Sequence, residues 1–96
     1  MLVITEEEFK TKGNSTLFVQ FSATWCGPCK ALSNTIDQIS EDIEHTIYKM
    51  DIDNCHELCA TLGIRSVPTL IRFENGKEIK RLTGNKSASE LIEFTN

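Results

Sequence analysis

The stretch Trp25-Cys26-Gly27-Pro28-Cys29-Lys30 places two cysteines three residues apart, where an apolar segment gives way to a helical pattern. Upstream, Leu17–Phe21 is a short, nearly continuous apolar run, which predicts a strand covered on both faces. Downstream, apolar residues from Leu32 to Ile43 recur at spacings of four, three and four, which predicts one apolar helix stripe. We therefore expect the cysteine pair at the N-terminus of a helix that follows a central strand.

This position suits thiol chemistry. The thiolate is the reactive form of cysteine, and a free cysteine has a pKa near ~8.5. Unpaired N–H groups and the dipole at a helix N-terminus stabilise negative charge. Cys26 is placed to receive that stabilisation, and Cys29 lies about one turn later, within disulfide reach but deeper. We predict that Cys26 attacks a substrate disulfide and that Cys29 resolves the mixed disulfide.

The two residues between the cysteines fit this geometry. Gly27 permits a tight turn, and Pro28 suits the first helical turn, where its missing N–H costs nothing. Two alternatives compete with the redox interpretation: inert packing, or a zinc site completed by Cys55, Cys59 and His56. We favour the redox interpretation, because C-x-x-C within a strand–helix–strand pattern is itself a redox signature, and we expect no metal and no bound cofactor.

The whole chain predicts an α/β fold of order βαβαβαββα, with a mixed central sheet flanked by helices on both faces. A strand–helix–strand unit implies a parallel pair with a right-handed crossover. Asn75-Gly76 is a strong hairpin signal. We expect a single domain over residues 1–96. Its other elements are a strand at Val3, a helix from Thr5 to Gly13 with Glu8 completing a capping box, a strand Thr46–Asp51, a helix capped by Asn54 and ended by Gly63, strands Thr69–Phe73 and Glu78–Leu82, and a helix capped by Ser87 with Glu90.

Composition narrows the possible partners. The chain has 96 residues and a net charge of −4, whereas nucleic acid and anionic membranes require a basic face. No apolar run approaches the ~20 residues of a membrane span. Met1–Thr5 is followed directly by three glutamates, unlike the basic and then apolar start of a signal peptide. We therefore expect a cytoplasmic protein that binds neither nucleic acid nor membrane.

The stretch Trp25–Lys30 resembles the active site of the thioredoxin family residue for residue. The likeness extends to Gly63–Thr69, which is similar to the family's cis-proline segment, to the hairpin Phe73–Lys77 and to Gly84. It implies a thioredoxin fold and a cis Pro68 beside Cys26, although sequence alone favours a trans proline at a strand start. The substrate groove that it implies comprises Trp25, Gly27, Pro28, Val67, Pro68 and Gly84.

The resemblance also implies a function. Such a protein is a monomeric electron carrier of cell redox homeostasis that reduces protein disulfides. A thioredoxin reductase using NADPH and flavin regenerates it, since this chain has no Gly-rich nucleotide motif of its own. Two other functions remain open: a thioredoxin-fold binding or structural subunit, and a glutaredoxin-like carrier fed by glutathione.

Two positions depart from the family pattern. Gln20 stands where the family usually has a buried Asp that accepts the proton of the resolving thiol, and glutamine cannot titrate. Lys49 matches the lysine that normally neighbours that Asp. We expect activity to be retained, with slower resolution by Cys29 at neutral pH. Asn34 replaces a proline in the long helix, which we expect to be straighter.

The second pair of cysteines, Cys55 and Cys59, is spaced i, i+4 on an apolar helical stripe. We favour two small buried apolar residues. A disulfide between them would distort a helix, because bonded Cβ atoms lie ~3.8 Å apart and i, i+4 neighbours ~5–6 Å. Some animal thioredoxins carry a cysteine at the position of Cys55, which leaves a regulatory role open. His45 and His56 are expected at the surface.

Overall fold

The central strand is β2 (Thr16–Ser22), whose apolar run is buried between two neighbours. A computed structural model describes residues 1–13 and 15–96. The five-stranded sheet has the order β1-β3-β2-β4-β5, with β2 parallel to β3 and antiparallel to β4. The other strands are β1 (Leu2–Val3), β3 (Ile47–Asp51), β4 (Thr69–Glu74) and β5 (Lys77–Thr83). This is the mixed sheet that the sequence predicted.

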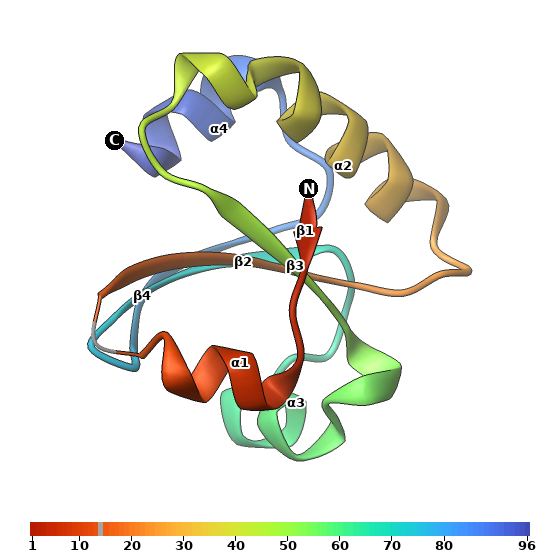
Figure 1. The fold of residues 1–96 in the computed structure, drawn as a ribbon. Coiled ribbons are helices and arrows are strands. Elements are labelled where there is room, and N and C mark those ends of the chain that lie inside the picture. Colours follow the sequence, from red (N-terminus) through yellow and green to blue (C-terminus); the bar gives the residue numbers. More distant parts are fainter. Residues whose placement is uncertain (14) are drawn as a thin grey trace.

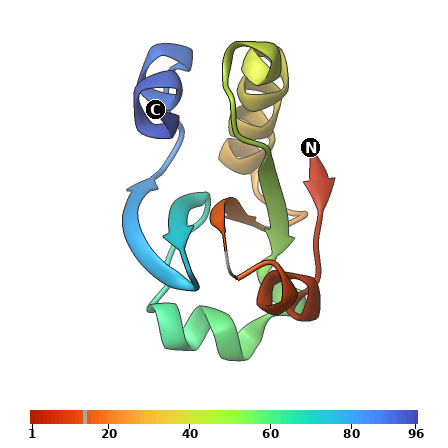
Figure 2. The ribbon, with the colours of Figure 1, turned by 60° about the vertical axis from the view of Figure 1, so that its left-hand side comes forward.

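Helices cover both faces of the sheet. Figure 1 shows α2 (Gly27–Ile39) and α4 (Ala88–Thr95) on one side, and α1 (Glu6–Thr11) and α3 (His56–Leu62) on the other. Figure 2, turned by 60°, shows the same division into layers. Side chains along β2 point alternately to the two faces of the sheet, so each face presents an apolar surface to a helix layer. Phe18 packs with α2 and α4, whereas Val19 and Phe21 belong to the core against α1. The order βαβαβαββα is confirmed.

Capping and turn signals are also confirmed. Thr5 with Glu8, and Ser87 with Glu90, form reciprocal capping boxes at α1 and α4. Gly63 ends α3 in the left-handed conformation, with φ of 65°. The hairpin residues Asn75 and Gly76 both have positive φ, as a two-residue hairpin turn requires.

Two expected boundaries are wrong. Ile43 lies beyond α2, because the helix ends at Ile39 and tightens into the 3₁₀ turn η1 (Ser40–Asp42), although Ile43 still packs against the core. Asn54 does not cap α3. It ends a second 3₁₀ turn, η2 (Ile52–Asn54), in which Asp51 Oδ1 accepts a 2.9 Å hydrogen bond from Asp53 N. The N-cap of α3 is therefore Cys55.

Long apolar helices are absent from the described part of the chain. Across residues 1–13 and 15–96, no helix combines the length and the apolar composition needed to cross a bilayer.

Candidate active site

Cys26 is the N-cap of α2, as the sequence predicted. Its backbone is extended, with φ of −94° and ψ of 110°, and its sulfur accepts a 3.1 Å hydrogen bond from the backbone N–H of Cys29. The proline of the motif, Pro28, occupies the first turn of the helix. The start of α2 therefore directs an N–H group and the positive end of the helix dipole at the Cys26 sulfur.

Cys26 and Cys29 are joined as a disulfide, with Cα atoms 5.3 Å apart. Cys26 is 5% exposed and Cys29 is 1% exposed, which confirms that the second cysteine is the deeper one. The pair packs with Ala23, and the partly buried side chains of Ile52 and Val67 close this small apolar cluster. The cysteine nearer the surface is therefore the one that the helix N-terminus stabilises.

The loop before β4 contacts this pair. The Val67–Pro68 peptide bond is cis, as the resemblance implied. The carbonyl oxygen of Val67 lies 3.8 Å from the sulfur of Cys26. Gly84, with φ of 89°, donates its N–H to the carbonyl of Pro68 at 2.9 Å. Three segments far apart in the sequence thus meet beside the reactive sulfur.

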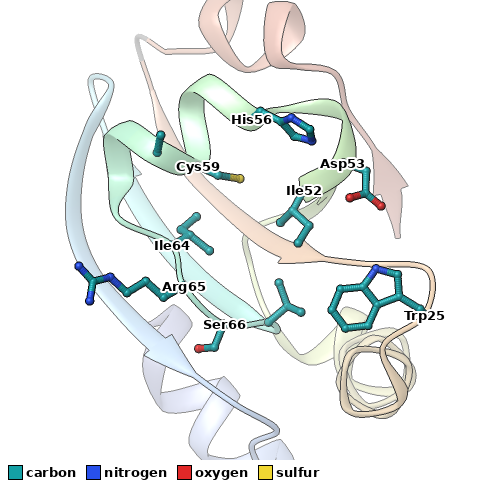
Figure 3. Close-up of a pocket in the computed structure, with 10 residues that line it drawn as sticks. Trp25, Ile52, Asp53, His56, Cys59, Ile64, Arg65 and Ser66 are labelled. Carbon is teal, nitrogen blue, oxygen red and sulfur yellow. The ribbon is translucent and has the colours of Figure 1, made fainter.

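A cleft of about 590 Å³ opens next to the disulfide. Trp25, which is 70% exposed, stands at one side of it, and α3 with the loop that follows forms the other side (Figure 3). Of the six groove residues expected, Trp25 and Val67 line this cleft. Gly27 and Pro28 are exposed at the start of α2, and Pro68 is buried. The lining also includes residues that sequence reasoning missed: Ile52, Asp53, His56, Cys59, Ala60, Ile64, Arg65 and Ser66.

A recognisable signal could have identified part of that lining. Ile52 and Asp53 directly follow β3, and sites in open α/β sheets lie outside the carboxyl ends of parallel strands. The contribution of Cys59 has no such signal, because it depends on how α3 is oriented over the sheet.

Gln20 is fully buried and contacts the backbone of the second cysteine. Its Nε2 donates to the carbonyl of Cys29 at 3.2 Å, and its Oε1 accepts from the hydroxyl of Ser33 at 3.2 Å. In the β2–β3 register Gln20 faces Lys49. Lys49 lines a second cleft of about 330 Å³, together with Cys29 and Asp51. Both ends of the Gln20 amide are therefore hydrogen-bonded, and this side chain has no group that can titrate.

The second cysteine pair differs from the expected two buried residues. Cys55 is 2% exposed, whereas Cys59 is only partly buried, and their sulfurs lie 3.3 Å apart. Burial and the adjacent Cys59 thiol raise the pKa of Cys55 to about 12. Burial also raises the pKa of Cys59, although its hydrogen bond with Cys55 acts in the opposite direction. Both groups are therefore thiols at neutral pH.

The two histidines lie in different surroundings. His56 is exposed, as expected, whereas His45 is half-buried, with its ring 5.1 Å from that of Phe18. Among residues 1–13 and 15–96, no three His, Cys, Asp or Glu side chains are grouped so that they could hold a metal ion.

Comparisons with known proteins agree with this geometry. A family model described as Thioredoxin matches residues 1–96. A protein named thioredoxin from Echinococcus granulosus is 39% identical over 89 residues, covering 90% of this chain and 83% of the relative. A solved structure of thioredoxin from Malassezia sympodialis has a TM-score of 0.86 at 31% identity, covering 99% of this chain and 87% of that one. A bifunctional thioredoxin reductase/thioredoxin of Mycobacterium leprae is 35% identical over 81 residues, covering 82% of this chain and 18% of the relative.

Proposed function

The chain belongs to the thioredoxin family, and we propose that Cys26 is the attacking sulfur and Cys29 the resolving sulfur of its disulfide reduction. The protein is a disulfide oxidoreductase whose redox-active pair is Cys26–Cys29. The observation that carries the division of roles is the 3.1 Å hydrogen bond from Cys29 N to Cys26 Sγ. It favours the thiolate at Cys26, and the 1% exposure of Cys29 keeps the second sulfur away from substrates.

The proposed reaction proceeds in two exchanges. In the reduced protein, the Cys26 thiolate attacks one sulfur of a substrate disulfide, and the other substrate sulfur leaves as a thiolate. The thiol of Cys29 then loses its proton and attacks Cys26 Sγ, which releases the second substrate sulfur. Two electrons pass to the substrate, and the protein ends with the Cys26–Cys29 disulfide, the state in the structure.

We place the protein substrate along Trp25 and the loop before β4. The carbonyl of Val67 beside Cys26 Sγ offers an acceptor to an extended peptide, and the cleft beyond it can take an apolar side chain. Gly27, Pro28, Pro68 and Gly84 complete the proposed groove by shaping the surface around the sulfur. The exposure of Trp25 supports this placement, because a large apolar ring left in water favours a contact site.

A thioredoxin reductase is the proposed electron donor. The Mycobacterium leprae relative joins a reductase and a thioredoxin in one chain, which supports such a partner for this protein. In this scheme NADPH and flavin act on the reductase, and this chain carries the electrons onward as a cytoplasmic monomer without a bound cofactor of its own.

A coupled assay tests this function. The protein is mixed with insulin, NADPH and a thioredoxin reductase, and separately with glutathione, glutathione reductase and NADPH. We expect turnover in the first mixture, and none from the Cys26→Ser/Cys29→Ser variant used as the control. Turnover only in the second mixture would favour a glutaredoxin-like carrier, and no turnover in either would favour a binding subunit.

A further inference from the structure

Cys55 and Cys59 are placed as a dithiol. Their sulfurs are 3.3 Å apart, and both are free cysteines. Closing a disulfide requires the sulfurs to approach to about 2.05 Å, a movement of little more than about 1 Å. Side-chain rotation and a small shift of the chain can supply such a movement.

The backbone at Cys55 permits that shift. Within a regular helix, an i, i+4 disulfide would strain the turn that joins the two residues. Cys55 is instead the N-cap of α3, with φ of −146° and ψ of 48°, and only Cys59 lies in the helix proper. The N–H of Cys59 still donates to the carbonyl of Cys55 at 3.0 Å, so the adjustment falls on the two side chains and on the 3₁₀ turn Ile52–Asn54 that precedes α3.

The two thiols differ in access. Cys55 is 2% exposed and directs its sulfur at the carbonyl of Asp51, 3.3 Å away. Cys59 lines the cleft, and Figure 3 shows its sulfur pointing toward Ile52. The arrangement repeats that of the first pair, in which one sulfur is reachable from the cleft and the other is held behind it.

The cleft suits a small anionic ligand. Its volume of about 590 Å³ is in the range of small-molecule sites, and Trp25, Ile52 and Ile64 supply apolar walls. Arg65 supplies a guanidinium group and His56 an imidazole that can hydrogen-bond a carboxylate, against the single carboxylate of Asp53. Glutathione disulfide carries several carboxylates and a disulfide that a thiolate can attack.

We propose that Cys55 and Cys59 form a second thiol–disulfide site, in which Cys59 reacts with a glutathione-type disulfide in the cleft and Cys55 resolves the adduct. The Cys59 thiol loses its proton and attacks one sulfur of the small disulfide, and the other sulfur leaves as a thiolate. The Cys55 thiol then loses its proton and attacks Cys59 Sγ, the second small thiolate leaves, and a Cys55–Cys59 disulfide remains. The two protons that the protein releases pass to the two leaving thiolates. One small disulfide is reduced to two thiols, and two protein thiols are oxidised. Because the adduct occupies the cleft beside Trp25, the site links small disulfides to the access of protein substrates.

The test uses the full chain with Cys26→Ser/Cys29→Ser, so its result is independent of the proposed protein-disulfide reduction. The folded protein is incubated with glutathione disulfide, and products are mapped by mass spectrometry. We expect both remaining thiols to disappear and the mass of the protein to fall by that of two hydrogens. We also expect a peptide cross-link between Cys55 and Cys59. Unchanged thiols, when urea-unfolded protein reacts fully in the same time, would overturn the proposal.

Two further variants separate the roles. When Cys55→Ser is added to the Cys26→Ser/Cys29→Ser protein, incubation with glutathione disulfide should leave a stable glutathione adduct on Cys59. Adding Cys59→Ser should leave Cys55 slower to react by at least about tenfold, because a buried thiol is inert. Equal adduct rates at the two positions would overturn the assigned order. Circular dichroism verifies folding, and if either variant unfolds, the cross-link mapped in the parent protein decides the matter.

Discussion

The side chain of Gln20 donates a hydrogen bond from Nε2 to the carbonyl oxygen of Cys29 at 3.2 Å. The hydroxyl of Ser33 fixes the other end of the amide, and the side chain is fully buried. A neutral amide, hydrogen-bonded at both ends, therefore occupies the position that the family resemblance assigns to the proton acceptor of Cys29. The charged residues that line a cleft together with Cys29 are Lys30, Lys49 and Asp51.

This relationship predicts the pH dependence of resolution. In Gln20→Asp, the new carboxylate can act as a base for Cys29, and we expect resolution at neutral pH to be roughly tenfold faster than in the native protein. The measurement is the rate of release of a fluorescent thiol from a preformed Cys26 mixed disulfide, from pH 5 to 10. Coincident pH profiles for the two proteins would mean that Gln20 has no influence on this step.

The same substitution should lower stability at neutral pH. A fully buried carboxyl group has a raised folded-state pKa, so its stabilising effect is present below its unfolded pKa and is lost as pH rises through the folded value. We expect Gln20→Asp to unfold at lower urea concentration than the native protein at pH 7, and the difference to shrink toward pH 4. A constant difference across that range would contradict burial of the new carboxyl group.

Trp25 should contribute to substrate binding rather than to the core. Because its side chain is 70% exposed, Trp25→Ala should change the free energy of unfolding by less than ~0.5 kcal/mol. The KM for a protein disulfide should rise about 5–30-fold, which corresponds to ~1–2 kcal/mol of lost contact. Ile79→Ala on β5, which removes a 52% exposed apolar side chain outside the cleft lining, is the matched control. A large loss of stability in Trp25→Ala would place the ring in the core.

The Cys55 thiol predicts a loss of stability in alkali. Its folded pKa of about 12 lies above the ordinary 9.0, so its contribution is present below pH 9 and is lost as pH rises toward 12. In the Cys26→Ser/Cys29→Ser background, the free energy of unfolding is measured in urea at pH 8 and pH 10.5. It should fall more between these two pH values in the protein that keeps Cys55 than in the Cys55→Ala variant. Equal drops would indicate that Cys55 ionises as easily in the folded state as in the unfolded state.

Two glycines give a matched test of backbone conformation. Gly63 has φ of 65°, and a Cβ there meets no atom within 4 Å, so only the left-handed backbone opposes a side chain. We expect Gly63→Ala to cost about 1–2 kcal/mol of stability in urea unfolding. Gly27 also has space for a Cβ but has no positive φ, and Gly27→Ala should change stability by less than about 1 kcal/mol. Similar effects at both positions would contradict the conformational explanation.

The fold was predictable because local signals and burial agree along most of the chain. The apolar run of β2, the capping boxes at Thr5 and Ser87, and the Asn75-Gly76 turn each specify one element without reference to distant contacts. The cis bond at Pro68 was different, because local preference favours trans and only the family resemblance implied the cis form.

What sequence reasoning missed depends on tertiary placement. The 3₁₀ turn that Asp51 stabilises moves the start of α3 from Asn54 to Cys55, and this change takes Cys55 out of regular helix geometry. The Cys55 and Cys59 sulfurs lie 3.3 Å apart at this junction. Likewise, Cys59 lines the cleft because of the way α3 lies over the sheet, which spacing alone does not encode.

Trapping of the mixed disulfide tests the assigned roles of Cys26 and Cys29 most directly. The two single variants, Cys29→Ser and Cys26→Ser, are reduced, freed of reductant and incubated with oxidised insulin, and the products are mapped by mass spectrometry. We predict that Cys29→Ser accumulates a stable insulin adduct on Cys26, whereas Cys26→Ser forms almost none, because Cys29 is 1% exposed. An equally abundant adduct on Cys29 in Cys26→Ser would contradict the account.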